Sequence, residues 1–415
     1  MSVLVQKYGG QCVATPALIK QVARKVIEAR RAGYSVLVVM SAMGNTTDDL
    51  ISFAHQVSAQ PSPRELDMLI TVGERISISL LSMAISDLGF DSISFTGSQS
   101  GIITTDQHNR ARVVDVRPGR IVDSLKQGKI VIVAGFQGVS QQKEITTLGR
   151  GGSDLTAVVL AKALGAERCE LRKGVPGVMS ADPQFVPDAR LLEVLSAEKL
   201  LELSCGGASV VHRRAAQFIC RNRLPVLICS GLTEGPGTRI VSENEMKKEA
   251  DSAAASERPE AASLDSVVSC GPVCSVTVGF TNAGAAQIAS LFEALSRRDV
   301  TLDMVSDSSS RRKYRLRFVV SDEDLPAVED ALRQGEFADA LKWDVVCDLA
   351  EVSIVGSGFL SEAAILGGIH RALAAAGVAV IGTAVSALRI SLLVARENEQ
   401  AAVSAIHGLI SRRDF

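Results

Sequence analysis

Apolar runs alternate with amphipathic stretches through the first 240 residues of the chain. Ser35–Met40 and Lys129–Ala134 are continuous apolar segments of the kind that forms strands buried on both faces. Before the first of these segments, Leu18, Val22 and Val26 repeat at helical spacing and predict an amphipathic helix. Alternation of strand and helix over this length predicts an α/β fold, with a mostly parallel sheet covered by helices on both sides.

The pattern changes after Ile240. The next stretch is rich in Lys, Glu, Ala and Ser and has no strand signal, which predicts a linker. Two similar blocks follow, from about Val267 to Gly335 and from Asp344 to Ile410, and each predicts a βαββ unit. Such a small repeated α/β unit suits a ligand site at an interface. The predicted division is a first domain over 1–241, a linker over 242–265, and two small domains over 266–340 and 341–415.

Charge and composition narrow the class of partner. The 415 residues carry 44 basic and 46 acidic side chains, a net charge of −2, and only 22% are charged. This balance gives no electrostatic footprint for nucleic acid or an anionic membrane, so small molecules and protein surfaces are the expected partners. The apolar, Ala/Gly-rich stretch from Ala372 to Leu388 is better explained by a helix, turn and strand than by a membrane span.

The cysteines and the N-terminal sequence indicate the cellular compartment of the protein. The eight cysteines lack the paired spacing of a zinc site or a disulfide scaffold, so we expect reduced thiols and no metal site. The opening MSVLVQKYGG runs directly into a strand and lacks the features of a signal peptide. Both observations predict a cytoplasmic protein.

Three glycine-containing segments stand where predicted strands end. They are Lys7–Gly10, Gly135–Gly138 and Gly149–Asp154. Backbone without side chains can approach a phosphate closely, and a following helix offers its free amides to the same anion. Each segment alone is a weak signal, and none fits the Walker or dinucleotide fingerprint. Their occurrence together in a parallel α/β domain, with Lys, Arg and Asp at strand ends, favours a phosphate-binding site.

The motifs KYGG, SAMGNTTDDL, TVGERIS, VAGFQG and TTLGRGGSDLTAV follow one another in the order and approximate spacing of the aspartate kinase family. The two C-terminal repeats resemble the paired ACT regulatory domains of that family. The resemblance covers nearly the whole chain and implies an amino-acid kinase three-layer sandwich. It also implies transfer of the γ-phosphoryl group of ATP to the side-chain carboxylate of aspartate with Mg²⁺, and a homodimer or higher oligomer formed through the ACT domains.

The resemblance further implies roles for individual residues. Lys7 would stabilise the transferring phosphoryl group, and Asp154 would orient this lysine and the metal-nucleotide side. Arg150 would clamp the substrate α-carboxylate as a planar fork, and Glu74 would hold the α-ammonium. The remaining implied site residues are Ser41, Thr47 and Ser153 for the substrate and Gly9, Gly10, Arg172, Lys173, Gly177, Ser180, Asp182 and Ser209 for the nucleotide.

The chain departs from the family mainly in the nucleotide half. Where the family reads YTDVDGVYTADPR, Leu171–Gln184 reads LRKGVPGVMSADPQ and lacks both aspartates of TDVD. Ser209 replaces a phosphate-contacting lysine, and Gly10–Val13 replaces GGTS. The second repeat also departs from the family at Val380–Ser386, so inherited control by lysine or threonine is not expected. The substrate motifs are nearly intact.

Two interpretations follow. In the first, an active kinase uses Arg172 and Lys173 to restore the positive charge lost at Ser209. In the second, the protein is a non-catalytic amino-acid-binding or regulatory relative. A third possibility is a kinase with a changed phosphoryl acceptor, because Gln11 and Cys12 sit near the expected position of the acceptor carboxylate.

Overall fold

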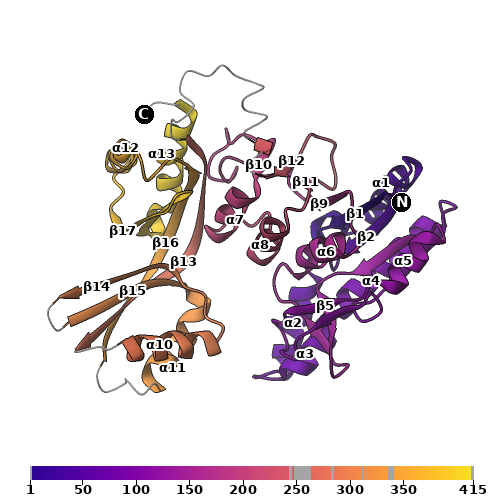
Figure 1. The fold of residues 1–415 in the computed structure, drawn as a ribbon, viewed down its shortest axis with the longest axis horizontal. Helices are drawn as coiled ribbons and strands as arrows, with labels where there is room; N and C mark the ends of the chain where they lie inside the picture. Colours follow the sequence, from indigo (N-terminus) through magenta and orange to yellow (C-terminus); the bar gives the residue numbers. More distant parts are fainter. Residues whose placement is uncertain are drawn as a thin grey trace. The chain divides into compact units, whose positions relative to one another are not determined.

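The computed structural model describes residues 2–242, 245–246, 263–281, 285–310, 313–334 and 341–412. They form two compact units, coloured along the chain in Figure 1. The N-terminal unit takes residues 1–179, 191–205 and 209–255, and the C-terminal unit takes 180–190, 206–208 and 256–415. The predicted linker lies almost entirely outside the described residues.

The N-terminal unit is built on an eight-stranded sheet of order β10-β12-β11-β9-β1-β2-β6-β3. All neighbouring strands run parallel except β11 and β12, which confirms the predicted mostly parallel sheet. The two continuous apolar runs are the adjacent strands β2 and β6. The strands are β1 (Val3–Tyr8), β2 (Ser35–Met40), β3 (Ser92–Phe95), β6 (Ile130–Ala134), β9 (Arg168–Lys173), β10 (Val194–Ser196), β11 (Val226–Ser230) and β12 (Thr238–Val241).

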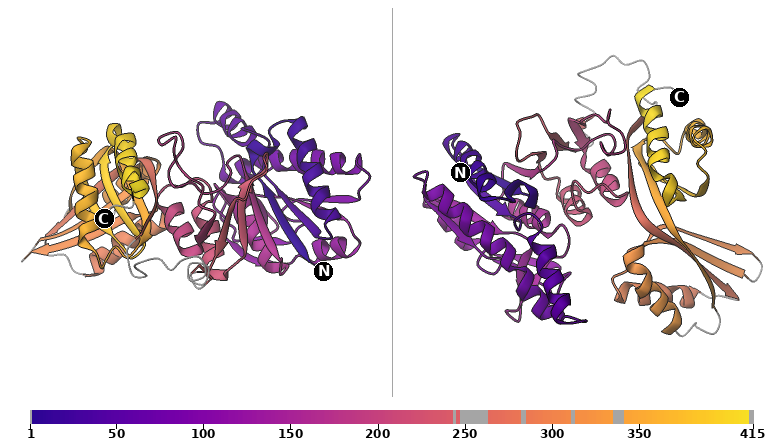
Figure 2. Two further views of the ribbon diagram at one scale, coloured as in Figure 1. Left: turned by 90° about the horizontal axis from the view of Figure 1, so that it is seen from above. Right: turned by 180° about the vertical axis from the view of Figure 1, so that it is seen from behind.

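Helices cover both faces of this sheet, as Figure 2 shows. On one face, α1 (Pro16–Arg31) and α4 (Val72–Ser86) pack against alternate strand side chains, including Tyr8, Val38 and Ile132. On the other face α6 (Gly152–Ala163) contacts β1, β2 and β9. Alternate side chains of the sheet therefore face α1 and α4 on one side and α6 on the other. The remaining helices of this layer system are α5 (Gly119–Lys126), α7 (Ala197–Cys205) and α8 (Arg213–Asn222), with the short 3-10 helix η1 (Gly10–Val13) after β1.

A smaller sheet of order β5-β4-β7-β8 completes the N-terminal unit. The buried carboxylate of Asp67, on α3, ties this sheet to the helices. It accepts hydrogen bonds from Thr147 Oγ1 at 2.6 Å and from the amide of Asn109, and it contacts His108 Nδ1 at 2.8 Å. The elements of this region are α2 (Thr46–Val57), α3 (Pro63–Ile70), β4 (Ile102–Thr104), β5 (Val113–Val116), β7 (Gln137–Ser140) and β8 (Ile145–Thr147).

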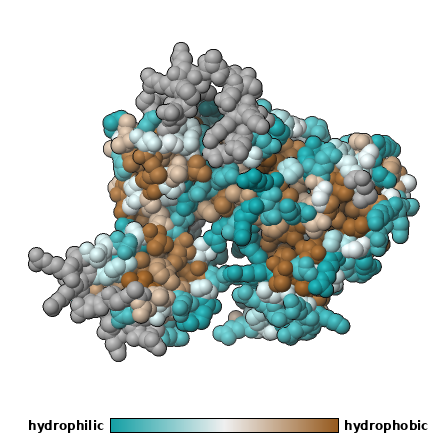
Figure 3. Space-filling view, viewed as in Figure 1, coloured by the Kyte–Doolittle hydropathy of each residue, from teal (hydrophilic) through white to brown (hydrophobic). Residues whose placement is uncertain are grey.

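One stretch of the described residues, Pro63–Ser86, is long and apolar enough to cross a membrane by length and composition alone. It comprises α3 and α4, and Ile78, Leu81 and Ile85 of α4 lie in the core beneath the sheet. This packing accounts for part of its apolar character, while Ile76 and Met83 of α4 are exposed. Apolar and polar side chains are interspersed on the visible faces of both units in Figure 3.

The C-terminal unit is built on one antiparallel six-stranded sheet of order β14-β15-β13-β16-β18-β17. Its two long central strands are β13 (Ser263–Thr281), in the first predicted repeat, and β16 (Leu341–Ser357), in the second. They pair along nearly their whole length, so the two repeats share a single sheet. The outer strands are β14 (Asp303–Ser310), β15 (Lys313–Ser321), β17 (Val380–Val385) and β18 (Arg389–Ala395).

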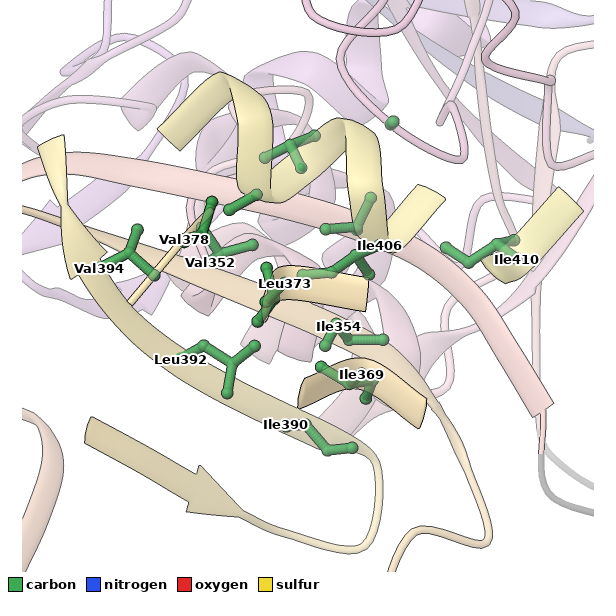
Figure 4. Packing of buried hydrophobic residues seen from close by; sticks show 14 of the residues in the cluster. Val352, Ile354, Ile369, Leu373, Val378, Ile390, Leu392, Val394, Ile406 and Ile410 are labelled. Atoms are coloured by element: carbon green, nitrogen blue, oxygen red, sulfur yellow. The ribbon is translucent and has the colours of Figure 1, made fainter. Parts of the chain in front are cut away.

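Each half of this sheet has its own core and two helices. One core includes Phe318 and Val328, and the other gathers residues of β16, β18, α12 and α13. Figure 4 shows Ile369 and Leu373 of α12 packed together with the strand residues Ile354 and Leu392 and the helix residue Ile406. The second helix of each half was not predicted, although the apolar residues of the later one, such as Val403, Ile406 and Ile410, recur at helical spacing. The helices are α10 (Ala285–Arg297), α11 (Leu325–Gln334), α12 (Ala363–Ala375) and α13 (Glu399–Arg412).

Residues 180–190 belong to the C-terminal unit although the sequence places them inside the first predicted domain. Ala181 and Val186 are buried in the core of α12 and α13. Ser180 Oγ lies 2.9 Å from Nε2 of the buried His407, and the amide of Val267 donates to the Ser180 carbonyl at 2.8 Å. The flanking residues 179 and 191 pair in a β-bridge of the N-terminal unit. The chain therefore leaves that unit at residue 180 and returns to it at residue 191. The division at residue 241 stays a prediction.

Candidate active site

Three charged side chains, buried Lys7 and Asp154 and the partly buried Lys173, meet on the α6 face of the parallel sheet. Lys7 stands near the end of β1, Lys173 ends β9, and Asp154 lies in the first turn of α6. Lys7 Nζ lies 2.8 Å from Asp154 Oδ1, and Lys173 Nζ lies 2.6 Å from Asp154 Oδ2. Two ammonium groups around one carboxylate leave one net positive charge. The site therefore lies at the carboxyl ends of parallel strands, where α/β proteins bind ligands.

The charges of this cluster hold one another in the ionised state. Burial raises the pKa of Asp154, but the ammonium groups of Lys173 and Lys7 outweigh it and keep that pKa well below its usual range. Burial lowers the pKa of Lys173 to about 8, while Asp154 opposes the fall and Lys7 adds to it. At neutral pH Lys173 is therefore mostly charged.

Arg172, which sequence analysis paired with Lys173, points to the opposite face of the sheet. Successive strand residues face opposite sides, and the Arg172 guanidinium lies over the Tyr8 ring at 5.7 Å. Its Nη2 and Nε donate to Glu170 Oε2 at 2.8 and 3.0 Å. Both residues line a cavity of about 240 Å³ beside α1, together with Gln6 and Lys25. The structure thus brings Lys173, but not Arg172, to the lysine–aspartate cluster.

The predicted glycine segments make close backbone approaches around this cluster. A Cβ on Gly10 would lie 2.9 Å from the Ala42 carbonyl oxygen, and one on Gly135 would lie 2.8 Å from Ser153 Oγ. Gly151 has φ of +70°, and a Cβ there would lie 2.0 Å from His212 Cβ. Gly9 folds beside the cluster, because a Cβ on it would lie 3.7 Å from Lys7 Nζ. Larger residues at these positions would displace the strand ends and the start of α6.

Glu74 is a buried carboxylate with an unused oxygen. It lies in the first turn of α4 and is 3% exposed. Its Oε1 accepts a hydrogen bond from the Ala42 amide at 3.1 Å, whereas Oε2 has no partner among the described residues. Burial raises the pKa of Glu74 to about 8, although the nearby Lys7 charge opposes the rise. A buried acceptor without a donor is costly, so this oxygen fits a cationic ligand group.

The other predicted substrate residues are distributed around these two groups. Ser41 follows β2, and its carbonyl accepts from Ser77 Oγ on α4 at 2.8 Å, one turn from Glu74. Ser153 is buried beside Asp154. Thr47 is half-buried in the first turn of α2, and Arg150 is exposed in the turn before α6.

The remaining predicted nucleotide residues fall in different places. Gly177 is in the N-terminal unit, where a Cβ would lie 2.6 Å from Thr238 Oγ1. Ser209 is exposed in the same unit. Ser180 and Asp182 belong to the C-terminal unit, where Ser180 contacts His407 and Asp182 Oδ1 accepts from the Gln184 amide at 2.8 Å. Within the described residues, only part of the predicted nucleotide set thus gathers in one unit.

Cys12, proposed near the acceptor position, is fully buried in η1. Burial raises the pKa of its thiol, although Lys7 opposes the rise. A buried, protonated thiol acts as a small packing residue rather than as a nucleophile.

Comparisons with known proteins agree with this geometry. The sequence model of the amino acid kinase family matches residues 2–230. The aspartokinase of Mycolicibacterium smegmatis is 40% identical, with 98% of this chain and 96% of the relative covered, and aspartokinase 2 of Bacillus subtilis is 37% identical over 98% and 97%.

Solved structures give the same fold. Escherichia coli aspartokinase III in complex with aspartate and ADP superimposes with a TM-score of 0.83 at 21% identity, covering 98% of this chain and 99% of that one. The aspartate kinase of Synechocystis has a TM-score of 0.54 at 30% identity, covering 99% of this chain and 69% of that chain.

The chain therefore belongs to the amino acid kinase family, and its fold is the α/β sandwich of that family followed by a regulatory region. Within the family it is a member of the aspartokinases, which the full-length identity of about 40% shows. It is a kinase, and the comparisons do not favour the non-catalytic alternative.

Proposed function

We propose that the chain catalyses transfer of the γ-phosphoryl group of ATP to the side-chain carboxylate of aspartate, giving an acyl phosphate. The observation that carries this proposal is the cluster of Lys7, Asp154 and Lys173 at the strand ends. A carboxylate and a triphosphate repel each other, so the catalyst must neutralise charge and hold the two in line. A pair of ammonium groups held in place by one buried carboxylate is suited to that task.

In this proposal the two lysines share the work. Lys7, beside the Gly9 turn, contacts the transferring phosphoryl group, and Asp154 holds Lys7 and Lys173 in register. Lys173 supplies positive charge to the nucleotide half, where Ser209 stands in place of a lysine. In this proposal the positive charge comes from β9 rather than from the turn that contains Ser209, and the chain is an active kinase with a rearranged nucleotide site.

Glu74 is the proposed partner of the substrate ammonium. Its free Oε2 would accept a hydrogen bond from that group, and Ser41, Thr47, Arg150 and Ser153 would bind the rest of the amino acid. Binding a cation would ionise Glu74, so the carboxylate becomes charged only when its partner is present.

Mg²⁺ is expected with the nucleotide, yet Asp154 does not fit the role of its ligand. Both oxygens of Asp154 are occupied by ammonium groups at 2.8 and 2.6 Å. We therefore assign no metal ligand in this chain, and infer that the phosphate oxygens of ATP carry the ion with its waters.

The test is a trapping assay on the purified chain. Protein is incubated with ATP, Mg²⁺, hydroxylamine and aspartate, and the acyl phosphate is measured as its hydroxamate. Parallel reactions with glutamate and other acidic amino acids test for a changed acceptor. Hydroxamate from aspartate above the Lys7→Ala background supports the proposal, and its absence with every acceptor overturns it.

Assembly and control belong to the C-terminal unit. We infer a cytoplasmic homodimer or higher oligomer formed through the ACT-like repeats, with allosteric control by an amino acid. Escherichia coli aspartokinase III has been solved with lysine and aspartate in a T-state. Because Val380–Ser386 departs from the family motif, the effector must be found by titrating each aspartate-derived amino acid calorimetrically.

A further inference from the structure

Two cysteines from neighbouring strands face each other in the C-terminal sheet. Cys274 lies in β13 and Cys347 in β16, and their Sγ atoms are 2.7 Å apart. Both are free thiols; Cys274 is buried and Cys347 is exposed. Since 73 positions separate them along the chain, cysteine spacing could not indicate the pair.

A β-bulge creates this contact. Val273 pairs with Leu349 and Ser275 pairs with Val346, so two residues of β16 stand opposite the single residue Cys274. One of these, Asp348, has φ of +56°, in the left-handed region. The bulge brings the Cys347 thiol beside Cys274 across the strand pair.

We propose that Cys274 and Cys347 form a modification site at which a hydroperoxide converts the two thiols into a cross-strand disulfide. In the first step the Cys347 sulfur attacks one peroxide oxygen, the O–O bond breaks, and a sulfenic acid and one water are formed. In the second step the Cys274 sulfur attacks the Cys347 sulfur, and the S–O bond breaks. The hydroxyl leaves as water with the Cys274 proton. Two thiols are oxidised, and one peroxide is reduced to two waters.

The two thiols differ in exposure and in pKa, as the two reaction steps require. Cys347 is exposed, so a small peroxide reaches it first. Burial, the neighbouring Cys347 and the Asp322 carboxylate all raise the pKa of Cys274, so this thiol stays protonated and unreactive until a sulfenic acid forms beside it. Cys347 is thus the peroxide-sensing thiol and Cys274 the resolving thiol.

A metal ion fits the pair less well than a disulfide. Cys274, Cys347 and Asp322 have donor atoms within 4.8 Å of one another. Two thiolates on a tetrahedral zinc ion, each about 2.3 Å from it, would stand about 3.8 Å apart. The observed 2.7 Å is well short of that separation, so zinc would have to spread the two strands.

The bond would lie where the two halves of the C-terminal sheet meet. Residues of β13 up to Cys270 pair with Glu351–Ser357, and those from Val273 onward pair with Leu341–Leu349. A disulfide at Cys274 would fix β13 to β16 at this change of register. It would also close a long loop of chain, which is the geometry that gains most in stability.

Peptide mapping of the full-length protein tests the proposal directly. Reduced protein is treated with one equivalent of hydrogen peroxide, alkylated, digested and analysed by mass spectrometry. We expect one crosslinked peptide pair that contains Cys274 and Cys347, has lost two hydrogen atoms, and returns to two alkylated thiols with dithiothreitol. The oxidised protein should melt about 5 °C higher. None of these readouts depends on kinase activity.

Single variants separate the steps. Cys274→Ala should leave a Cys347 sulfenic acid that dimedone traps, and Cys347→Ser should leave Cys274 unoxidised. Cys220→Ser, in the N-terminal unit, is the matched control and should crosslink like the wild type. The proposal fails if both thiols stay alkylatable after peroxide or if the bond forms between chains. It also fails if one equivalent of Zn²⁺ protects both thiols while peroxide does not join them.

Discussion

The two charged groups of the candidate active site differ in how their buried charges are satisfied. In the cluster of Lys7, Asp154 and Lys173, each carboxylate oxygen already has an ammonium partner. Glu74, by contrast, keeps one oxygen without a donor among the described residues and has a pKa raised to about 8. The first group is charged before any ligand arrives, and the second becomes charged when a ligand supplies the partner.

This difference separates two tasks. A preformed ion cluster resists reorganisation, which suits stabilisation of charge that develops during phosphoryl transfer. A neutral, half-satisfied carboxyl group selects for a cation, because only a cation can compensate its ionisation. Loss of the cluster should therefore act mainly on turnover, and loss of the Glu74 carboxylate mainly on substrate affinity.

Lys7→Ala should have the largest effect. Removing the ammonium beside the Gly9 turn should lower kcat by about 10³-fold, as loss of a charge-stabilising donor does in other enzymes. Lys173 remains to pair with Asp154, so the protein should still fold. Hydroxamate formation and circular dichroism measure the two quantities, with the exposed Lys20→Ala as control. Turnover within twofold of wild type would remove Lys7 from the mechanism.

Glu74→Gln should raise KM for aspartate by about 10 to 100-fold with a smaller change in kcat, because the amide cannot pair ionically with the ammonium. The pH profile is the sharper readout. Because the pKa of Glu74 is raised to about 8, its protonated form predominates below that pH. kcat/KM for aspartate should therefore rise with pH up to about 8 in the wild type and lose this rise in the variant.

The same shift in Glu74 affects stability in a defined direction. A carboxyl group whose pKa is higher in the folded protein favours folding at low pH, and this contribution is lost as the pH rises through about 8. Above that pH, Glu74→Gln should melt at a higher temperature than wild type. Below the ordinary pKa of glutamate, the variant should not melt higher than wild type. Parallel melting curves that never separate with pH would contradict the buried, protonated state.

Lys173→Ala should raise KM for ATP by about tenfold and lower kcat by a similar factor, a smaller effect than Lys7→Ala, since Lys7 still balances Asp154. Lys173→Arg should restore part of the loss if charge is what matters. An unchanged KM for ATP would show that Lys173 contributes nothing to the nucleotide half, and the proposed compensation for Ser209 would fall.

Arg172→Ala should have the smallest effect on catalysis. Its guanidinium pairs with the buried Glu170 on the opposite face, so KM for ATP should stay within twofold of wild type. Stability should fall by about 3 kcal/mol, because Glu170 loses a buried partner. Chemical unfolding measures the loss, and Arg172→Lys should recover some of it. A raised KM without lost stability would place Arg172 in the nucleotide site after all.

The sequence predicted the parallel sheet, its glycine turns and both C-terminal repeats, because these depend on local patterns of apolar residues. It could not separate Arg172 from Lys173. The alternation of side chains along β9 does separate them, but only once the strand and its register with β1 are known. The contact between Cys274 and Cys347 depends on a bulge in β16, and no local pattern encodes it. The free oxygen of Glu74 likewise follows from the packing of α4 against the loop after β2.

Because residues 180–190 belong to the C-terminal unit, the two units are not separate stretches of the chain. Part of the hydrophobic core of the regulatory unit, Ala181 and Val186, is encoded in the middle of the kinase sequence. A regulatory module grafted from a relative by cutting in the linker would thus arrive without these side chains. A C-terminal fragment that begins in the linker should therefore be less stable than the same unit within the full chain.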